Sequence, residues 1–254
     1  MVRKVFKKGI QRTFLGKPLA ANEYTIDSLS VLQDYLKFKP AQIRQVICKQ
    51  SQFASLAKSL GKACDLVAVK DQDYEEKSPI LARVEVVVGG ENALFERIQG
   101  PSRRLVLALD HLQDPHNLGA IARTAAFFGV REIMAPKDRQ VPLTQSAVDT
   151  SQGAFSLCDL YTVTNLTRAL EKAKDLGYWI AGADMEGQDI GEVSNIPEKT
   201  VLVLGAEGKG LSSLVRKSCD FSYRICGAEQ ALQSLNVSVA SGILIQKLFS
   251  CQKS

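Results

Sequence analysis

The sequence lacks the features of membrane proteins and of proteins built around metals or disulfides. No run approaches the roughly 18 consecutive apolar residues that a membrane-spanning helix needs, and the longest runs, such as 80-ILARVEVVV-88, are broken by charge. The six cysteines form no C-x-x-C pair, and only two histidines accompany them. We therefore expect a soluble, cytoplasmic chain with no membrane partner, no metal site and no disulfide framework.

Acidic residues are missing from the start of the chain, where the first is Glu23. Six basic residues precede it, and removing their charge from the net +5 leaves 5 − 6 = −1 for the rest of the chain. A basic arm on a nearly neutral body suits a polyanion, because each phosphate contact releases a counterion. The residues that we expect to bind RNA are Arg3, Lys4, Lys7, Lys8 and Arg12.

Two other interpretations of this arm remain open. It is a solvated tail, or it is a mitochondrial presequence that would make the location organellar, since apolar residues recur at four-residue spacing between Val2 and Phe14. Against a presequence, the first fifteen residues are rich in lysine and contain no serine.

The body of the chain has the size and composition of one to two globular domains, since 254 residues with 45% hydrophobic content are enough to form a core in each. Residues 21–88 alternate helical and strand patterns and predict a small α/β domain. Glycines 89, 90 and 100 and Pro101 indicate a connection, so we place the domains at 1–95 and 96–254.

The second domain alternates apolar strands with helical patterns and predicts a mainly parallel sheet covered on both faces. We expect strands at 104–109, 132–135, 178–183 and 201–204, and helices at 117–129, 165–176 and 234–249. Ligands of such sheets bind beyond the carboxyl ends of the strands, so the segments after these strands are the candidate site.

The first such segment is 110-DHLQDPHNLGAIARTAAFFGV-130. Asn117 stands where a helix N-cap is expected, and His116 is expected to be a turn residue. On a helical wheel Arg123 lies about 164° from the centre of the apolar face, so it points away from the core. A solvated arginine and a plain structural cap would also explain this pattern.

The second segment is 201-VLVLGAEGKGLS-212, a buried strand followed by a glycine-rich turn. Its glycine spacing matches neither the P-loop nor the dinucleotide-binding pattern, which excludes a kinase or a nucleotide-dependent dehydrogenase of those types. The carboxylate of Glu207 disfavours a phosphate ligand and suits a hydroxyl or amino group. An ordinary tight turn is the alternative.

The third segment, 232-LQSLNVSVASGILIQKLF-249, begins with Ser234 and Asn236 and continues as a helix that is apolar nearly all round. Such a helix should be buried on most sides. Its polar start either caps the helix or holds a ligand anion.

Taken in order, N-L-G-A-I-A-R, L-G-A-E-G-x-G-L and S-L-N-V-S-V-A closely resemble the three motifs of the SpoU (TrmH-like) RNA 2′-O-ribose methyltransferases of the SPOUT superfamily. The resemblance covers residues 104 to 249, and D-P-H-N-L-G-A and P-K-D-R add to it. The first domain, ending in I-L-A-R-V, looks like the ribosomal-protein-like RNA-binding domain that many members carry.

The resemblance implies an α/β fold with a C-terminal deep trefoil knot, S-adenosylmethionine as the cofactor, no metal, and a homodimer whose interface includes the C-terminal helix. Members usually read I-P-M before the third motif, whereas 224-RICGAEQALQ-233 contains neither proline nor methionine. The cofactor-binding residues that the resemblance implies are Gly182, Ala183, Leu204, Gly205, Gly208, Ile225, Cys226 and Leu235. The catalytic residues that it implies are Asn117, Arg123, Glu207, Ser234 and Asn236.

The implied reaction is methyl transfer to a ribose 2′-hydroxyl. We expect Arg123 to hold the phosphate next to the target nucleotide and to stabilise the developing alkoxide, since a guanidinium is a poor base at neutral pH. The first domain favours ribosomal RNA over transfer RNA as the partner. The alternatives are a transfer RNA methyltransferase and an RNA-binding or ribosome-assembly protein that has lost catalysis.

Overall fold

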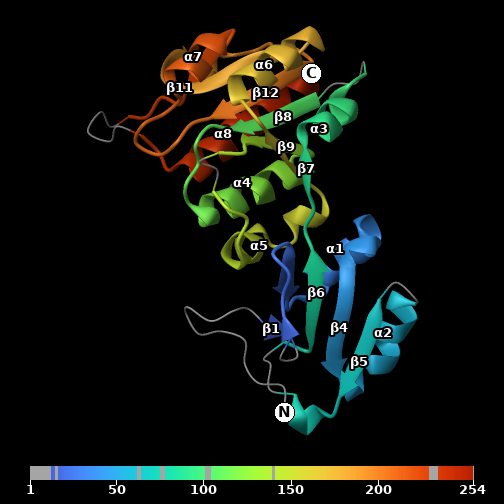
Figure 1. Cartoon of the computed structure of the whole chain (residues 1–254). Helices are drawn as coiled ribbons and strands as arrows, with labels where there is room; N and C mark the ends of the chain where they lie inside the picture. Colours follow the sequence, from blue (N-terminus) through green and yellow to red (C-terminus); the bar gives the residue numbers. More distant parts are fainter. Residues whose placement is uncertain are drawn as a thin grey trace. The chain divides into compact units, whose positions relative to one another are not determined.

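The computed structural model describes residues 13–14, 17–61, 64–74, 78–100, 104–138, 141–228 and 234–253. The chain divides into two compact units, residues 1–87 with 155–157, and residues 88–154 with 158–254. Both appear in Figure 1. The predicted RNA-binding residues of the basic arm lie outside the described residues. No helix among the described residues is long and apolar enough to cross a membrane.

The first unit contains a four-stranded sheet in the order β3 (Glu23–Ile26), β6 (Ile80–Glu85), β4 (Ile43–Lys49) and β5 (Asp65–Val69). The β4–β5 pair is parallel and the other two pairs are antiparallel. The helices of this unit are α1 (Leu29–Phe38) and α2 (Phe53–Leu60), and a short hairpin joins β1 (Thr13–Phe14) to β2 (Lys17–Pro18). Ser28 caps α1 by accepting a hydrogen bond from the Val31 amide. The expected small α/β unit is confirmed.

The second unit contains a seven-stranded sheet in which every pairing is parallel, which confirms the expected architecture. Its order is β13 (Phe221–Arg224), β11 (Trp179–Asp189), β12 (Lys199–Leu204), β8 (Arg104–Leu109), β9 (Glu132–Pro136), β10 (Asp159–Val163) and β7 (Val88–Gly90). The strands β7, β10 and β13 were not anticipated. They are short or mix polar with apolar residues, so a run of apolar residues does not reveal them.

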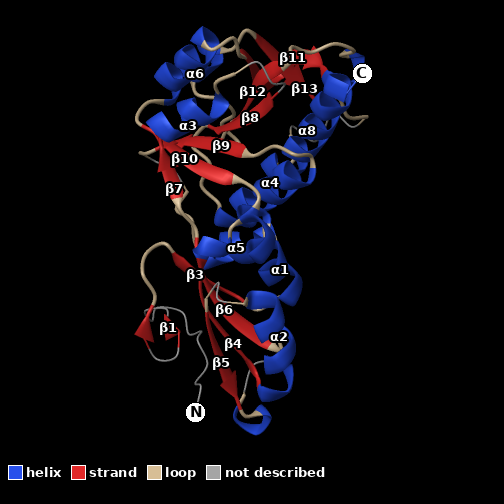
Figure 2. Cartoon of the chain, turned by 90° about the vertical axis from the view of Figure 1, so that its right-hand side faces the viewer, coloured by secondary structure: helices blue, strands red, loops and turns tan. Residues whose placement is uncertain are grey.

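Helices cover both faces of this sheet (Figure 2). On one face lie α3 (Glu91–Ile98), α6 (Leu166–Asp175) and α7 (Ser213–Ser218), whose buried side chains share one core cluster with the sheet. On the other face lie α4 (Pro115–Phe127) and α8 (Val237–Lys253), with α5 (Gln145–Ser151) packed on α4. The short 3-10 segments are 40–42, 50–52, 71–73, 154–156 and 190–192.

The contacts place residues 88–95 with the second unit, whereas the sequence places the boundary after residue 95. The reason is that Val88 pairs with Leu160 in β10, while Leu94 and Phe95 are buried in the core of the larger sheet. The deep knot stays a prediction.

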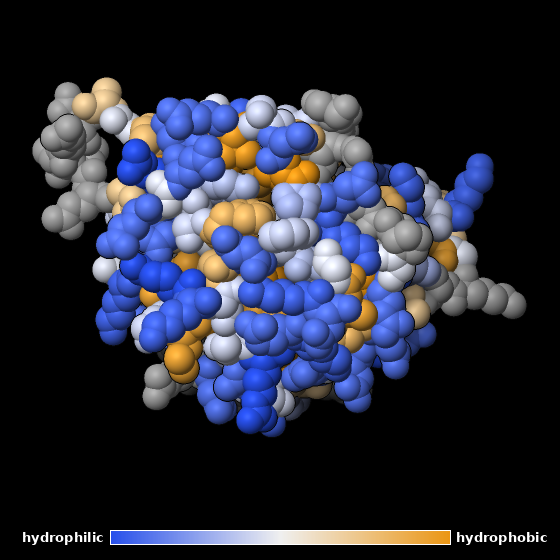
Figure 3. Space-filling view, turned by 90° about the horizontal axis from the view of Figure 1, so that it is seen from above, coloured by the Kyte–Doolittle hydropathy of each residue, from blue (hydrophilic) through white to orange (hydrophobic). Residues whose placement is uncertain are grey.

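Helices α4 and α8 run parallel to each other, and this brings their N-termini together. Asn236 contacts Asn117, a Cβ on Gly242 would lie 3.8 Å from Thr124 Cγ2, and the rings of Phe249 and Phe128 are 5.4 Å apart. Because the residue numbers rise together on both helices from one contact to the next, the two helices point in the same direction. The hydropathy surface in Figure 3 is mostly hydrophilic with scattered apolar patches, as is usual for a folded surface.

Candidate active site

The glycine-rich segment after β12 forms a tight loop closed by a backbone bridge between Ala206 and Gly210. The Ala206 amide donates to the Gly210 carbonyl at 3.1 Å, and the Gly210 amide donates back at 2.9 Å. A Cβ on Gly205 would lie 2.3 Å from the Gly210 carbonyl carbon, so only glycine lets the two backbones approach. Gly208 and Gly210 have φ of 72° and 65°, the left-handed region that favours glycine.

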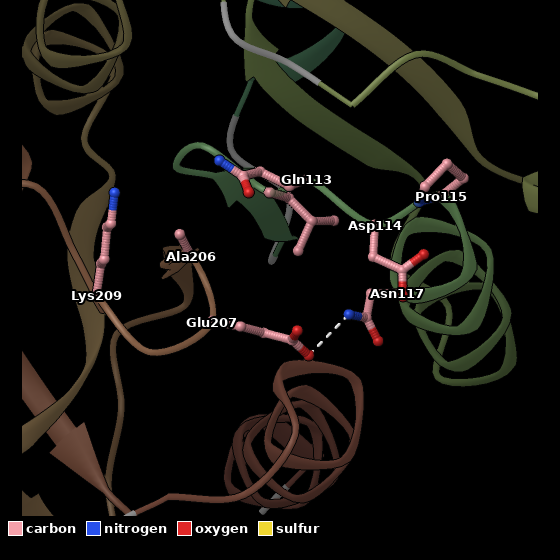
Figure 4. Close-up of a pocket in the computed structure, with 8 residues that line it drawn as sticks. Gln113, Asp114, Pro115, Asn117, Ala206, Glu207 and Lys209 are labelled. Atoms are coloured by element: carbon pink, nitrogen blue, oxygen red, sulfur yellow. Dashed lines mark hydrogen bonds between the residues drawn. The ribbon is translucent and has the colours of Figure 1, made fainter.

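This loop presents Glu207 to the first turns of two helices (Figure 4). Glu207 Oε1 accepts hydrogen bonds from Asn117 Nδ2 of α4 at 2.8 Å and from Asn236 Nδ2, just before α8, at 2.6 Å. Asn236 Nδ2 also lies 3.2 Å from Asn117 Oδ1. The positive ends of both helix dipoles favour a carboxylate at this point. We call these three residues the carboxamide clamp.

The capping of these helices differs from the sequence expectation. Asn117 is not the N-cap of α4; Asp114 is, and it accepts from the His116 amide at 2.9 Å, with Pro115 as the first helical residue. The prediction for Asn117 was wrong because proline at the first helical position places the N-cap three residues earlier. His116 is therefore helical rather than a turn residue, and its ring contacts Ser146 and Thr150 of α5.

The start of the third motif is held by Asn236 rather than by Ser234. Asn236 Oδ1 accepts from the Ser238 amide at 2.9 Å and lies 2.6 Å from its hydroxyl, so Asn236 both caps α8 and joins the clamp. Ser234 is exposed and makes no hydrogen bond to another described residue of the clamp. The structure thus brings together Asn117, Glu207 and Asn236 and leaves Ser234 beside them in sequence only.

Arg123 is exposed on α4, as the helical wheel predicted. Among the described residues it has no hydrogen-bond or ion-pair partner. Six helical positions separate it from Asn117, about 9 Å of rise and about 120° of rotation, so the two side chains leave different faces of the helix. Within one chain the structure does not place Arg123 in the carboxamide clamp.

Two functional candidates escaped the sequence analysis. Asp110, directly after β8, is 1% exposed; its Oδ2 accepts from the Ser212 amide at 2.7 Å and its Oδ1 lies 2.7 Å from His111 Nδ1. His111 has φ of 61°, a strained conformation for a residue with a Cβ. The available signal was position, because a polar pair that follows a buried parallel strand stands at the ligand edge of the sheet.

The predicted cofactor-binding residues lie on or after three neighbouring strands of the sheet. Gly182 and Ala183 lie within β11, Leu204 ends β12 and Gly205 follows it, Gly208 is in the loop, and Ile225 and Cys226 follow β13. Leu235 precedes α8 and is 48% exposed. Gly182 also has a packing role, since a Cβ there would lie 2.8 Å from Leu211 Cδ1 and 2.9 Å from Cys219 Sγ.

Titratable groups on and beside β11 and β13 have shifted pKa values, among them Cys219 and Asp189. Burial, assisted by the charge of Asp220, raises the pKa of Cys219 to about 11. The Gly191 amide, followed by Cys226, lowers the pKa of Asp189. Cys226 Sγ also accepts a hydrogen bond from Arg224 Nε at 3.3 Å.

Two adjoining cavities lie beside the glycine loop. The clamp cavity, about 420 Å³, is lined by Leu112, Gln113, Asp114, Pro115, Asn117, Ala206, Glu207 and Lys209. The side cavity, about 520 Å³, is lined by His111, Leu112, Gln113, Val141, Pro142, Ala206, Lys209, Gly210, Leu211 and Ser212. They share four lining residues, so a single elongated ligand can enter both.

Helix α8 is less buried in the single chain than its sequence suggests. Leu244, Ile245 and Leu248 are fully buried, but Val239 is 52% and Ile243 39% exposed. The expectation of burial on most sides is therefore wrong for one chain, because its packing partners cover only part of the helix. Val239 and Ile243 lie four residues apart on one face of α8 and form what we call the α8 stripe.

The comparison with known families decides the affiliation of this chain. The model of the SpoU rRNA Methylase family matches residues 104–246, which contain the carboxamide clamp and both cavities. The chain belongs to this family.

Curated relatives agree with this SpoU assignment. The chain is 43% identical over 161 residues to the 23S rRNA (guanosine-2′-O-)-methyltransferase RlmB of Pseudomonas aeruginosa, which covers 62% of this chain and 64% of that protein. It is 39% identical over 143 residues to the 23S rRNA (guanosine-2′-O-)-methyltransferase RlmB of Neisseria meningitidis, and this match covers 56% of this chain and 57% of that protein. The matched segment thus spans about three fifths of these relatives.

A solved structure shows the same fold over both units. The SpoU methyltransferase AviRb from Streptomyces viridochromogenes, in complex with AdoMet, matches with a TM-score of 0.74 at 20% identity and covers 91% of this chain and 90% of that one.

Proposed function

We propose that this protein is an S-adenosylmethionine-dependent RNA methyltransferase that methylates a ribose 2′-hydroxyl, in ribosomal RNA. The carboxamide clamp is the observation that carries the proposal. It places one carboxylate and two carboxamides at the carboxyl edge of the parallel sheet, beside a cavity, in a chain of the SpoU family. A hydroxyl group is the ligand that such donors and acceptors suit.

The described residues fit the cofactor. A Cβ added at Gly208 or Gly227 would have no heavy atom within 4 Å, so the backbone is open to a ligand at both positions. The exposed side chain of Leu235 and the half-buried side chain of Ile225 offer apolar surface to an adenine ring. The related AviRb is described in complex with AdoMet. When bound, the cofactor supplies an electrophilic methyl group, so the protein chiefly has to position the hydroxyl.

The residues of the chain then have distinct roles. Both hydrogen bonds of the clamp use Glu207 Oε1, and among the described residues Oε2 has no partner. Oε2 is therefore available to accept a hydrogen bond from the ribose hydroxyl. Asn117 and Asn236 fix the carboxylate so that Oε2 stays in place. Because Arg123 does not reach the clamp of its own chain, we assign it to the clamp of the partner in the proposed homodimer, where it holds a phosphate and stabilises the developing alkoxide. The proton leaves to a neighbour or to water.

Ribosomal RNA is the substrate class that we favour, because the curated relatives named above act on 23S rRNA. We assign substrate binding to the first unit and to the basic arm. Replacing Lys4, Lys7 and Lys8 together by glutamine should reduce the salt dependence of RNA affinity by about two units of slope, at about 0.7 per phosphate contact. The location that we propose is the cytoplasm.

The proposal is tested by mapping 2′-O-methyl sites in RNA from a strain that lacks the gene. We expect one ribosomal site to be lost and then restored by purified protein with S-adenosylmethionine, whereas transfer RNA is unchanged. Calorimetry should give a micromolar-scale Kd for the cofactor, roughly −7 to −8 kcal/mol. Unchanged ribosomal methylation together with loss of a transfer RNA site would redirect the assignment.

We also propose that the protein is a homodimer through the α8 stripe. Light scattering should give about 55 kDa, twice the 27.7 kDa of the chain. The variant Ile243→Glu should shift the protein toward monomer, because it places a charge in an apolar contact. A wild-type monomer at micromolar concentration would refute this role for the stripe.

A further inference from the structure

The side cavity differs in charge from the clamp cavity that it adjoins. Two carboxylates, Asp114 and Glu207, and one ammonium, Lys209, line the clamp cavity. Among the described residues that line the side cavity there is no acid, and Lys209 and His111 are the ionisable side chains. Among the described residues Lys209 has no carboxylate partner. An anion is therefore disfavoured in the clamp cavity and favoured in the side cavity.

His111 is held in a fixed orientation in this wall. Its Nδ1 lies 2.7 Å from Asp110 Oδ1, and because a carboxylate only accepts, Nδ1 carries the hydrogen. Nε2 remains and has no partner among the described residues. The side chain is 37% exposed. The buried Asp110 also holds the Ser212 amide at 2.7 Å, so one carboxylate fixes two walls of the cavity.

The backbone of His111 supports a binding role. A φ of 61° is uncommon for a residue with a Cβ, and glycine adopts it more readily. A turn that needed only this conformation would be served better by glycine. The imidazole itself is thus the feature that justifies the strain.

We propose that the side cavity binds an RNA phosphodiester and its nucleotide, next to the nucleotide whose ribose lies in the clamp cavity. The inference rests on the proposed RNA substrate. Lys209 and His111 Nε2 contact the phosphate, and Val141, Pro142 and Leu211 provide an apolar wall for the base. The volume of about 520 Å³ is within the range of small-ligand sites.

The carboxylate of the cofactor is the other anion that this chemistry would accept. We favour RNA, because S-adenosylmethionine carries a net positive charge and none of the eight predicted cofactor-binding residues lines the side cavity. The experiment below separates the two sources.

The two histidines of the chain provide a direct test, because His116 is held by Ser146 and Thr150 and does not line the side cavity. In protein labelled with ¹³C-histidine, guanylyl-(3′→5′)-uridine should shift the His111 ring resonance and leave that of His116 unchanged. An equimolar mixture of guanosine and uridine, which lacks the phosphate, should shift neither. The variant Lys209→Gln should lower the affinity for the dinucleotide at least fivefold. The control Lys217→Gln should leave that affinity unchanged, because Lys217 is exposed and lies outside the cavity.

Three outcomes of the titration would overturn the inference. The first is a His111 resonance that does not shift at saturating dinucleotide. The second is an equal shift of that resonance with the mixture of nucleosides. The third is a shift of that resonance with S-adenosylhomocysteine and none with the dinucleotide. The last outcome would assign the cavity to the cofactor. Because this measurement involves no methyl transfer, it holds whether or not the wild-type protein methylates RNA.

Kinetics give a second readout. His111→Gly removes the imidazole and relieves the strained φ, so its fold is expected to survive. It should raise the KM for ribosomal RNA about tenfold while kcat and cofactor affinity stay unchanged. Gln152→Gly is the matched control, since Gln152 has φ of 48° at the C-cap of α5 and lines neither cavity. An unchanged KM in active His111→Gly protein refutes the inference, whereas an inactive wild type refutes the proposed function alone.

Discussion

The variant Glu207→Gln tests the carboxamide clamp most directly. It preserves the size of the side chain and removes the charge that receives two amide donors at 2.8 and 2.6 Å. A hydrogen bond to a charged group contributes about 1 kcal/mol more than a neutral one, which gives about 2 kcal/mol for the pair. Glu207 is exposed, so we halve this value for solvent screening and expect about 1 kcal/mol of lost stability.

The measurement is urea unfolding followed by circular dichroism, together with the rate of methyl transfer to ribosomal RNA. A loss of about 1 kcal/mol corresponds to a Tm lowered by about 2–4 °C in a chain of this size. The methylation rate should fall at least about 10²-fold, or about 2.7 kcal/mol in activation free energy, because an amide no longer offers a charged acceptor to the ribose hydroxyl.

Glu186→Gln is the control, since this carboxylate is 85% exposed and, within the part of the chain that the structure describes, its one contact is with Arg216 at 3.5 Å. It should change stability by less than about 0.5 kcal/mol and leave the methylation rate unchanged. The reasoning fails if Glu207→Gln methylates at the wild-type rate. It also fails if that variant unfolds outright, since Glu207 would then be a structural residue.

Three further predictions address other residues. Arg123→Ala should cost less than about 0.5 kcal/mol, because Arg123 is exposed, but should lower the methylation rate at least 10²-fold, and a wild-type rate at saturating substrates would remove Arg123 from the mechanism. Gly205→Ala should destabilise the fold by about 1–3 kcal/mol and lower the affinity for S-adenosylhomocysteine measured by calorimetry, because its Cβ would meet backbone at 2.3 Å. The control Gly227→Ala, whose Cβ would have no atom within 4 Å, should change neither quantity. Equal behaviour of the two variants would contradict the loop argument. Iodoacetamide at pH 8 should label the exposed Cys226 well before Cys219, because burial raises the pKa of Cys219 to about 11. The labelling rate of Cys219 should rise only as the pH approaches that value. Equal labelling rates in mass spectrometry would contradict the burial of Cys219.

The sequence by itself determined the class of the second unit and the segments in which its candidate site lies. Apolar strands that alternate with helical patterns admit little besides a covered parallel sheet, because strands buried on both faces must be apolar throughout. Motif order pointed to the SpoU family, and the helical wheel placed Arg123 on the exposed face. These inferences depend on local periodicity and on residue identity, which the sequence contains.

Only the tertiary structure decided which of the motif residues meet. The carboxamide clamp joins Asn117, Glu207 and Asn236 across 119 positions of sequence, and that contact arises because α4 and α8 pack in parallel. The cap of α4 moved to Asp114 because proline fixed the first helical turn. Non-local packing also buried Asp110 against Ser212, and no periodicity in the sequence encodes that distance.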